Sequence, residues 1–172
     1  MTAFSATDTK AMANALNGRI MALANAHALI RPNPNNNCID SDADFAALMQ
    51  RILAPYGEDR YTIDGPPLAL GQKAVTSLAL IFHELATNAA KYGALSQEHG
   101  TVCISWHVND ANVNVSWKER GGPTITEAPS REGFGSELLN VSAESQLGGK
   151  CHRVWKKSGL IAEISLPIAN LR

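Results

Sequence analysis

Hydrophobic positions between Lys10 and Ile30 recur at spacings of three and four residues. They form one seam, with a histidine on the same line, made of Met12, Leu16, Ile20, Leu23, His27 and Ile30. Such a near-heptad seam predicts a helix that packs on a partner surface, either the rest of this chain or another helix of a hairpin or dimer. The breaker-rich run RPNPNNN at 31–37 then ends helical structure and divides the chain into segments 1–32 and 38–172.

The second segment begins with a predicted helix and a strand. Ser41 fits the N-cap of this helix, and Asp44 three residues later completes a capping box. The apolar stripe that follows consists of Phe45, Leu48, Ile52 and Leu53. Residues 60–64 alternate between apolar and polar side chains, which predicts a strand, and Gly65-Pro66-Pro67 ends it.

The rest of the chain predicts a long helix and two hairpins. The helix runs from Gln72 to Gly93, and its buried face consists of Val75, Leu78, Ala79, Phe82, Leu85, Ala86 and Ala89. A short helix at 136–147 separates two pairs of alternating segments, which predict strands at 101–108, 112–117, 150–156 and 160–167. This order of elements predicts an α/β sandwich with helices on one face of a mixed sheet.

Composition narrows the class of protein. The 172 residues are 45% hydrophobic and 18% charged, which suits one domain with a short appendage. A net charge of −1 argues against broad binding to nucleic acid or to a membrane surface, and no apolar run is long enough to span a bilayer. The start shows no secretory pattern and the three cysteines lie far apart, so we expect a cytoplasmic protein with reduced thiols.

A first polar cluster lies on the long helix. Glu84, Asn88 and Lys91 are spaced four and three residues apart and therefore share one face. A carboxylate can hold a water or a proton, an amide oxygen can ligate a hard cation, and a lysine can meet phosphate. A solvated helix face with an internal charge pair explains the same spacing, so this cluster alone leaves both interpretations open.

Two further clusters lie at glycine-rich turns. Glu119 ends a strand just before Gly121 and Gly122, where backbone can approach a flat ligand and the carboxylate can accept a hydrogen bond from an amine such as that of adenine. Gly133 and Gly135 precede a helix and expose N–H groups that suit phosphate. A surface acid in a turn and an ordinary helix entry explain these clusters as well, and neither is a dinucleotide fingerprint or a P-loop.

The order of the three clusters is more specific than any one of them. An Asn-bearing helix, an acidic glycine turn after a strand and Gly-x-Gly before a helix resemble the Bergerat ATP-binding fold of the GHKL group. The strings HELATNAAKYGALS, WKERGGP and REGFGSELL are similar to those of the HWE family of sensor histidine kinases. That family is named after a histidine and a Trp-x-Glu, which here are His83, Trp117 and Glu119. The resemblance begins near Asn17 and covers most of the chain.

The resemblance implies a role for each residue of the Asn-bearing box. Asn88 would ligate Mg²⁺, and Glu84 would stand where related ATPases keep a base, with His83 beside it in the same box. Lys91 and Tyr92 would contact phosphate or nucleotide.

The glycine boxes would supply the rest of the ATP site. Glu119 would hold the adenine amine in place of the usual aspartate, and Gly121 would let the ring approach. Gly133, Gly135 and Ser136 would line the triphosphate beneath a short lid at 124–132.

The same resemblance implies a phosphoacceptor histidine that is not evident in this chain. The family carries this histidine in a His-Arg-x-Lys-Asn motif. None of the five histidines of this chain stands in such a motif; they are His27, His83, His99, His107 and His152. The chain therefore resembles part of a dimerisation hairpin at 1–32 followed by a catalytic domain at 38–172. It would be a piece of a longer kinase, or a divergent protein that no longer phosphorylates itself.

The implied function is that of a histidine protein kinase. It would transfer the γ-phosphate of ATP to a histidine for relay to the aspartate of a response-regulator receiver domain, as a homodimer held by the N-terminal helix. The alternative is a non-catalytic histidine-phosphotransfer or interaction protein that retains the fold. Such relatives normally lose the acidic and glycine boxes, and both are intact here, which favours ATP binding.

Overall fold

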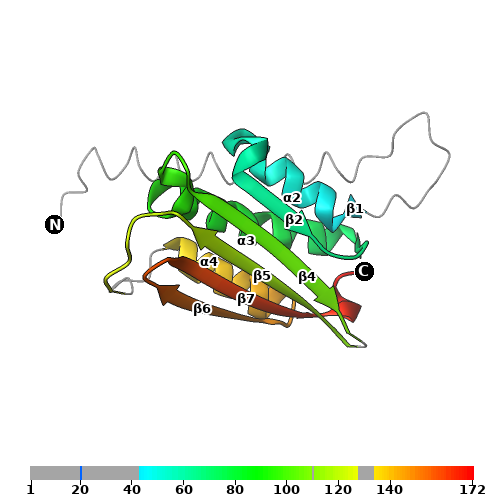
Figure 1. The fold of residues 1–172 in the computed structure, drawn as a ribbon. Helices are drawn as coiled ribbons and strands as arrows, with labels where there is room; N and C mark the ends of the chain where they lie inside the picture. The colour runs from blue at the N-terminus through cyan, green and yellow to red at the C-terminus, as the bar shows by residue number, and fades with distance from the viewer. Residues whose placement is uncertain (1–19, 21–42, 110, 128–133) are drawn as a thin grey trace.

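The computed structural model describes residues 20, 43–109, 111–127 and 134–172 (Figure 1). The helices in this part of the chain include α2 (Phe45–Leu53), α3 (Gln72–Lys91) and α4 (Phe134–Asn140). The strands are β1 (Ala43–Asp44), β2 (Tyr61–Asp64), β3 (Ala69–Leu70), β4 (Thr101–Val108), β5 (Asn112–Arg120), β6 (Lys150–Lys156) and β7 (Gly159–Pro167). Helices α2, α3 and α4 lie on one face of the large sheet (Figure 1), which confirms the predicted α/β sandwich.

The large sheet has the strand order β2-β4-β5-β7-β6. Strand β2 runs parallel to β4, and the other neighbouring pairs are antiparallel. The register places Glu119 of β5 opposite Val102 of β4, and Trp117 opposite Ala162 of β7. Because side chains alternate along a strand, Trp117 and Glu119 share one face, and both are buried under the helices near the end of β5.

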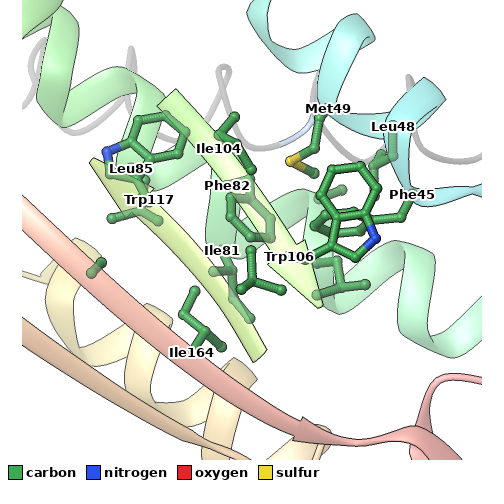
Figure 2. Close-up of a cluster of buried hydrophobic side chains, with 14 of the residues drawn as sticks. Phe45, Leu48, Met49, Ile81, Phe82, Leu85, Ile104, Trp106, Trp117 and Ile164 are labelled. Carbon is green, nitrogen blue, oxygen red and sulfur yellow. The ribbon is translucent and has the colours of Figure 1, made fainter. Parts of the chain in front are cut away.

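Aromatic rings join the helices to the sheet (Figure 2). Phe45 of α2 meets Phe82 of α3 edge-on, with ring centroids 5.5 Å apart, and Trp106 of β4 at 4.8 Å. Phe82 in turn lies 6.2 Å from Trp117 of β5. The first two pairs are edge-to-face, and pairs of that kind contribute about 0.5–1.5 kcal/mol each beyond the burial of their area. These ring contacts pack α2 and α3 against β4 and β5, and α3 and β5 carry two of the polar clusters.

The start of α2 differs from the prediction. Asp44, which we placed inside the first turn, is itself the N-cap, and its Oδ2 accepts a hydrogen bond from the backbone N–H of Ala47 at 3.2 Å. Its Oδ1 accepts from the N–H of Leu68 at 3.3 Å, so one carboxylate serves both the helix and the segment after β2. Aspartate and serine are equally good N-cap residues. The additional hydrogen bond from Leu68 favours Asp44 as the N-cap of α2. The predicted cap Ser41 lies outside the described residues.

Two other boundaries also differ. Strand β5 continues three residues past the predicted end at Trp117, because Lys118, Glu119 and Arg120 still pair with β4. Glu119 is therefore a residue of the sheet and not of a turn. The predicted helix at 136–147 begins earlier, at Phe134, and after Asn140 continues as a π-helix, Val141–Gln146.

The remaining predicted strands and the long helix are confirmed. The face predicted for α3 is buried along its whole length, and β2, β4, β6 and β7 lie within one residue of their predicted bounds. The predicted helix at 10–30, apart from Ile20, and the boundary at 31–37 lie outside the described residues. Within the part of the chain that is described, no helix is long and apolar enough to cross a membrane.

Candidate functional site

A cavity of about 570 Å³ opens at the end of the sheet where β5 finishes. Its walls come from the second half of α3, the segment 123–127, the start of α4 and the β6–β7 hairpin. Among the site residues predicted from the sequence, those that line it are Asn88, Tyr92, Glu119 and Gly135. Residues from all three sequence clusters thus meet around one space.

The carboxylate of Glu119 is fixed in the wall of this cavity. The side chain is 5% exposed, and its Oε2 accepts a hydrogen bond from the backbone N–H of Ala94 at 2.9 Å. Its Oε1 accepts from the indole Nε1–H of Trp117 at 3.2 Å. Burial raises the pKa of Glu119 above its ordinary value, and the hydrogen bonds from Ala94 and Trp117 oppose that rise in part. Each oxygen retains a lone pair for a further donor, such as a ligand amine.

Glycines surround this carboxylate where side chains would not fit. A Cβ on Gly93 would collide with Glu119 Oε2, and a Cβ on Gly122 would lie 2.8 Å from the backbone nitrogen of Ala94. Gly121 adopts the left-handed conformation with φ of 72°, which turns the chain out of β5. Gly121 is not among the residues that line the cavity, so its structural role is the turn itself.

The predicted polar face of α3 runs from the interior to solvent. Glu84 is 8% exposed, Asn88 one turn later is half-buried and lines the cavity, and Lys91 is exposed. A solvated helix face therefore does not describe this cluster. Tyr92, at the end of the helix, lines the cavity and is 76% exposed.

His83 lies in a different network. Its Nε2 is 3.5 Å from Thr87 Oγ1, one turn along α3, and Thr87 also forms a side-chain hydrogen bond with Tyr56. Neither His83 nor Glu84 is among the cavity residues. Gly133 and the side chain of Ser136 lie outside the described part of the chain.

Sequence reasoning missed the wall that the β6–β7 hairpin provides. Arg153 and Trp155 of β6 line the cavity together with Leu160 of β7. They lie opposite Ala162 and Leu160, which are buried, so both belong to the inward-facing set of their strand. The sequence signal that could have revealed this wall is Arg153 itself, a charged residue at an inward-facing position of an alternating strand. Among the described lining residues Arg153 is the cationic side chain, beside the acidic Glu119 and Glu127.

Comparison with known proteins finds the same family that the sequence resembles. The family model described as HWE histidine kinase matches residues 1–67. Blue-light-activated histidine kinase 1 of Erythrobacter litoralis is 39% identical over 167 residues, an alignment that covers 94% of this chain and 45% of that protein. Over these stretches the chain is similar to the HWE histidine kinases. It spans less than half the length of that relative.

Solved structures with the same fold are histidine kinase domains. The histidine kinase domain of a blue-light-activated histidine kinase from Erythrobacter litoralis matches with a TM-score of 0.71 at 18% identity, over 91% of this chain and 76% of that one. The ATP-binding domain of PrrB from Mycobacterium tuberculosis matches with a TM-score of 0.53 at 18% identity, over 74% of this chain and 98% of that one. This chain therefore has the fold of a histidine kinase catalytic domain.

The lining of the cavity fits a nucleotide with its metal. A volume near 570 Å³ lies within the usual range of ligand pockets. The described residues hold no group of three or more His, Cys, Asp or Glu side chains that could cage a metal ion. Mg²⁺ bound to nucleotides takes most of its ligands from phosphates and water, so a single amide oxygen such as that of Asn88 is a suitable protein ligand.

Proposed function

We propose that this chain forms the ATP-binding catalytic part of a histidine kinase, which transfers the γ-phosphate of ATP to a histidine for relay to an aspartate. The observation that carries this proposal is the buried carboxylate of Glu119, held by two N–H donors in the wall of a cavity of about 570 Å³. A fixed acceptor of this kind recognises a purine that carries an amine and disfavours one that does not.

Adenine would bind against Glu119. The carboxylate would accept a hydrogen bond from the exocyclic amine through a lone pair that Ala94 and Trp117 do not use. Tyr92 and Trp155 line the same cavity with exposed fractions of 76% and 37%, so their ring faces are free to pack on the base or the sugar.

The triphosphate would extend toward Asn88 and α4. Asn88 would supply an amide oxygen to Mg²⁺, and the bound ion would neutralise charge on the β- and γ-phosphates. Arg153 in the cavity wall and Lys91, three residues after Asn88, would supply positive charge. Gly133, Gly135 and Ser136 would follow the phosphates with their backbone N–H groups.

Glu84 is the proposed base because it precedes Asn88 by one helical turn on the same face. Its burial favours a specific role over a solvated one. For His83 we propose support of α3 through Thr87, since its ring lies beside that hydroxyl. The attacking histidine would belong to a dimerisation hairpin, in trans or in a further segment of the protein.

The partners follow from the same proposal. The phosphoryl group would pass to the receiver domain of a response regulator. The kinase would act as a homodimer through its N-terminal helix. Phosphorylation of the histidine and transfer to the receiver domain would both take place in the cytoplasm. A non-catalytic phosphotransfer or interaction protein is the less favoured alternative, because the carboxylate, its donors and the glycines around it are all in place.

The test is nucleotide binding with Mg²⁺, measured by calorimetry on the parent and on Asn88→Ala and Glu119→Ala. We expect the parent to bind ATP, and both substitutions to weaken that binding by about tenfold or more, as expected for lost charged hydrogen bonds or metal ligands. Glu144→Gln, at an exposed carboxylate of the π-helix, is the matched control and should bind as the parent does. A parent without affinity for ATP would overturn the proposal in favour of the non-catalytic alternative.

A further inference from the structure

Arg60 binds three backbone carbonyls of one loop. It ends the short 3₁₀ turn Glu58–Arg60 before β2 and is separated in sequence from the loop by more than thirty residues. Its Nε donates to the carbonyl oxygen of Gly100 at 2.7 Å, and its Nη2 donates to those of Gln97 at 2.5 Å and Leu95 at 3.4 Å. All three acceptors belong to residues 94–100, here called the 94–100 loop, which joins α3 to β4.

The other end of the 94–100 loop holds Glu119. The backbone N–H of Ala94, the first residue of the loop, donates to Glu119 Oε2 at 2.9 Å. The loop is packed tightly between these points, since a Cβ on Gly100 would collide with the carbonyl oxygen of Ala94. Gly122 packs against Ala94 from the side of β5. The carbonyls that Arg60 holds and the N–H that orients the carboxylate thus belong to one tightly packed loop.

We propose that Arg60 is a positioning residue for recognition of the adenine base, acting through the 94–100 loop on the carboxylate of Glu119. This inference rests on the proposed function of the cavity. A guanidinium presents several donors in a rigid plane, so it can hold carbonyls from different residues of a loop in one fixed arrangement. Lysine has a flexible stem and a compact ammonium and cannot reproduce that arrangement.

Loss of Arg60 would release the loop carbonyls to water and free the N–H of Ala94. Glu119 would then keep the single donor of Trp117, and its oxygens could turn away from the ligand amine. The substitution should therefore damage recognition of the base and leave binding of the triphosphate nearly intact. A purely structural role would instead lower stability and weaken all nucleotides alike.

The experiment compares ATP with inosine triphosphate, which carries an oxygen where adenine carries the amine. Dissociation constants for both nucleotides with Mg²⁺ are measured for the parent, Arg60→Lys and Arg60→Ala, together with melting temperatures. Lys73→Ala, at an exposed lysine in the first turn of α3, is the control for loss of a positive charge.

We expect the parent and Lys73→Ala to prefer ATP by about tenfold or more, because a buried carboxylate set to accept a hydrogen bond disfavours a base that presents an acceptor oxygen in place of the amine. Arg60→Ala should reduce this preference to about threefold or less, with affinity for inosine triphosphate changed by less than about threefold. Arg60→Lys should show an intermediate preference.

Two results separate this inference from the function on which it rests. A parent that binds no ATP removes the proposed function, and the role of Arg60 with it. A parent that prefers ATP, together with Arg60 variants that keep the same preference or weaken both nucleotides equally, overturns the role of Arg60 alone. Partial unfolding of a variant would lower its apparent affinity for both nucleotides by the same factor. The ratio of the two dissociation constants is therefore unaffected by a loss of stability.

Discussion

The indole nitrogen of Trp117 donates a hydrogen bond to the carboxylate of Glu119, two residues along the same strand and on the same buried face of the sheet. The two named residues of the Trp-x-Glu pattern are thus in direct contact through this hydrogen bond. The spacing of two puts both side chains on one face of β5, where the indole is one of the two N–H donors to the carboxylate, with the backbone of Ala94. The two residues form one unit of the candidate site.

Trp117→Phe should weaken ATP binding by about 1–3 kcal/mol, because it removes a donor to a buried carboxylate while an aromatic ring still fills the core. Calorimetry with Mg²⁺ and ATP measures the loss. Trp106→Phe is a matched control, since Trp106 is also buried and its Nε1 donates at 2.8 Å to the carbonyl of Pro66, away from the cavity. Equal losses of ATP affinity in the two variants would contradict a role specific to Trp117.

The raised pKa of Glu119 predicts a pH dependence of stability. At pH values between the ordinary pKa of 4.5 and the raised one, the folded protein holds a proton that the unfolded chain has released. The free energy of unfolding should therefore fall as pH increases through that window. Glu119→Gln should flatten this part of the curve when chemical denaturation is followed from about pH 4.5 to 8, a range that begins near the ordinary pKa and extends above it, where the raised pKa lies. A slope unchanged from that of the parent would show that Glu119 does not carry it.

Gly93→Ala should impair both the fold and the site, because the new methyl group would meet Glu119 Oε2. Overpacking of this kind costs about 1–3 kcal/mol of unfolding free energy. ATP affinity should fall as well, since the carboxylate must move to admit the methyl group. A variant with the melting temperature and ATP affinity of the parent would show that this contact is readily relieved.

Arg153→Gln should weaken ATP more than adenosine. The side chain is the cation in the described lining of the cavity, and its charge matters to a ligand that carries phosphates. We expect about a tenfold loss of ATP affinity, the size of one charge-assisted hydrogen bond, and little change for adenosine. Lys156→Gln, at an exposed position three residues along β6, is the control for charge. Equal losses for ATP and adenosine would place Arg153 away from the phosphates.

Much of the fold could be predicted because its signals are local. The stripe of α3 and the alternation of β4 mark their own buried faces, and Gly121 marks the turn that follows β5. The boundaries that differed depend on distant partners. Asp44 became the cap of α2 through a second bond to Leu68, and β5 continued past Trp117 because β4 was there to pair with it.

The sequence by itself determined most of the elements, the family resemblance and three clusters, each of which contributes at least one residue to the lining of one cavity. These follow from periodicity and from strings of neighbouring residues, which are properties of short stretches of chain. Only the tertiary structure decided that Glu119 meets the N–H of Ala94, that Arg60 holds the same loop, and that Arg153 enters the cavity wall. Those contacts join residues tens of positions apart, and sheet register and helix packing bring them together.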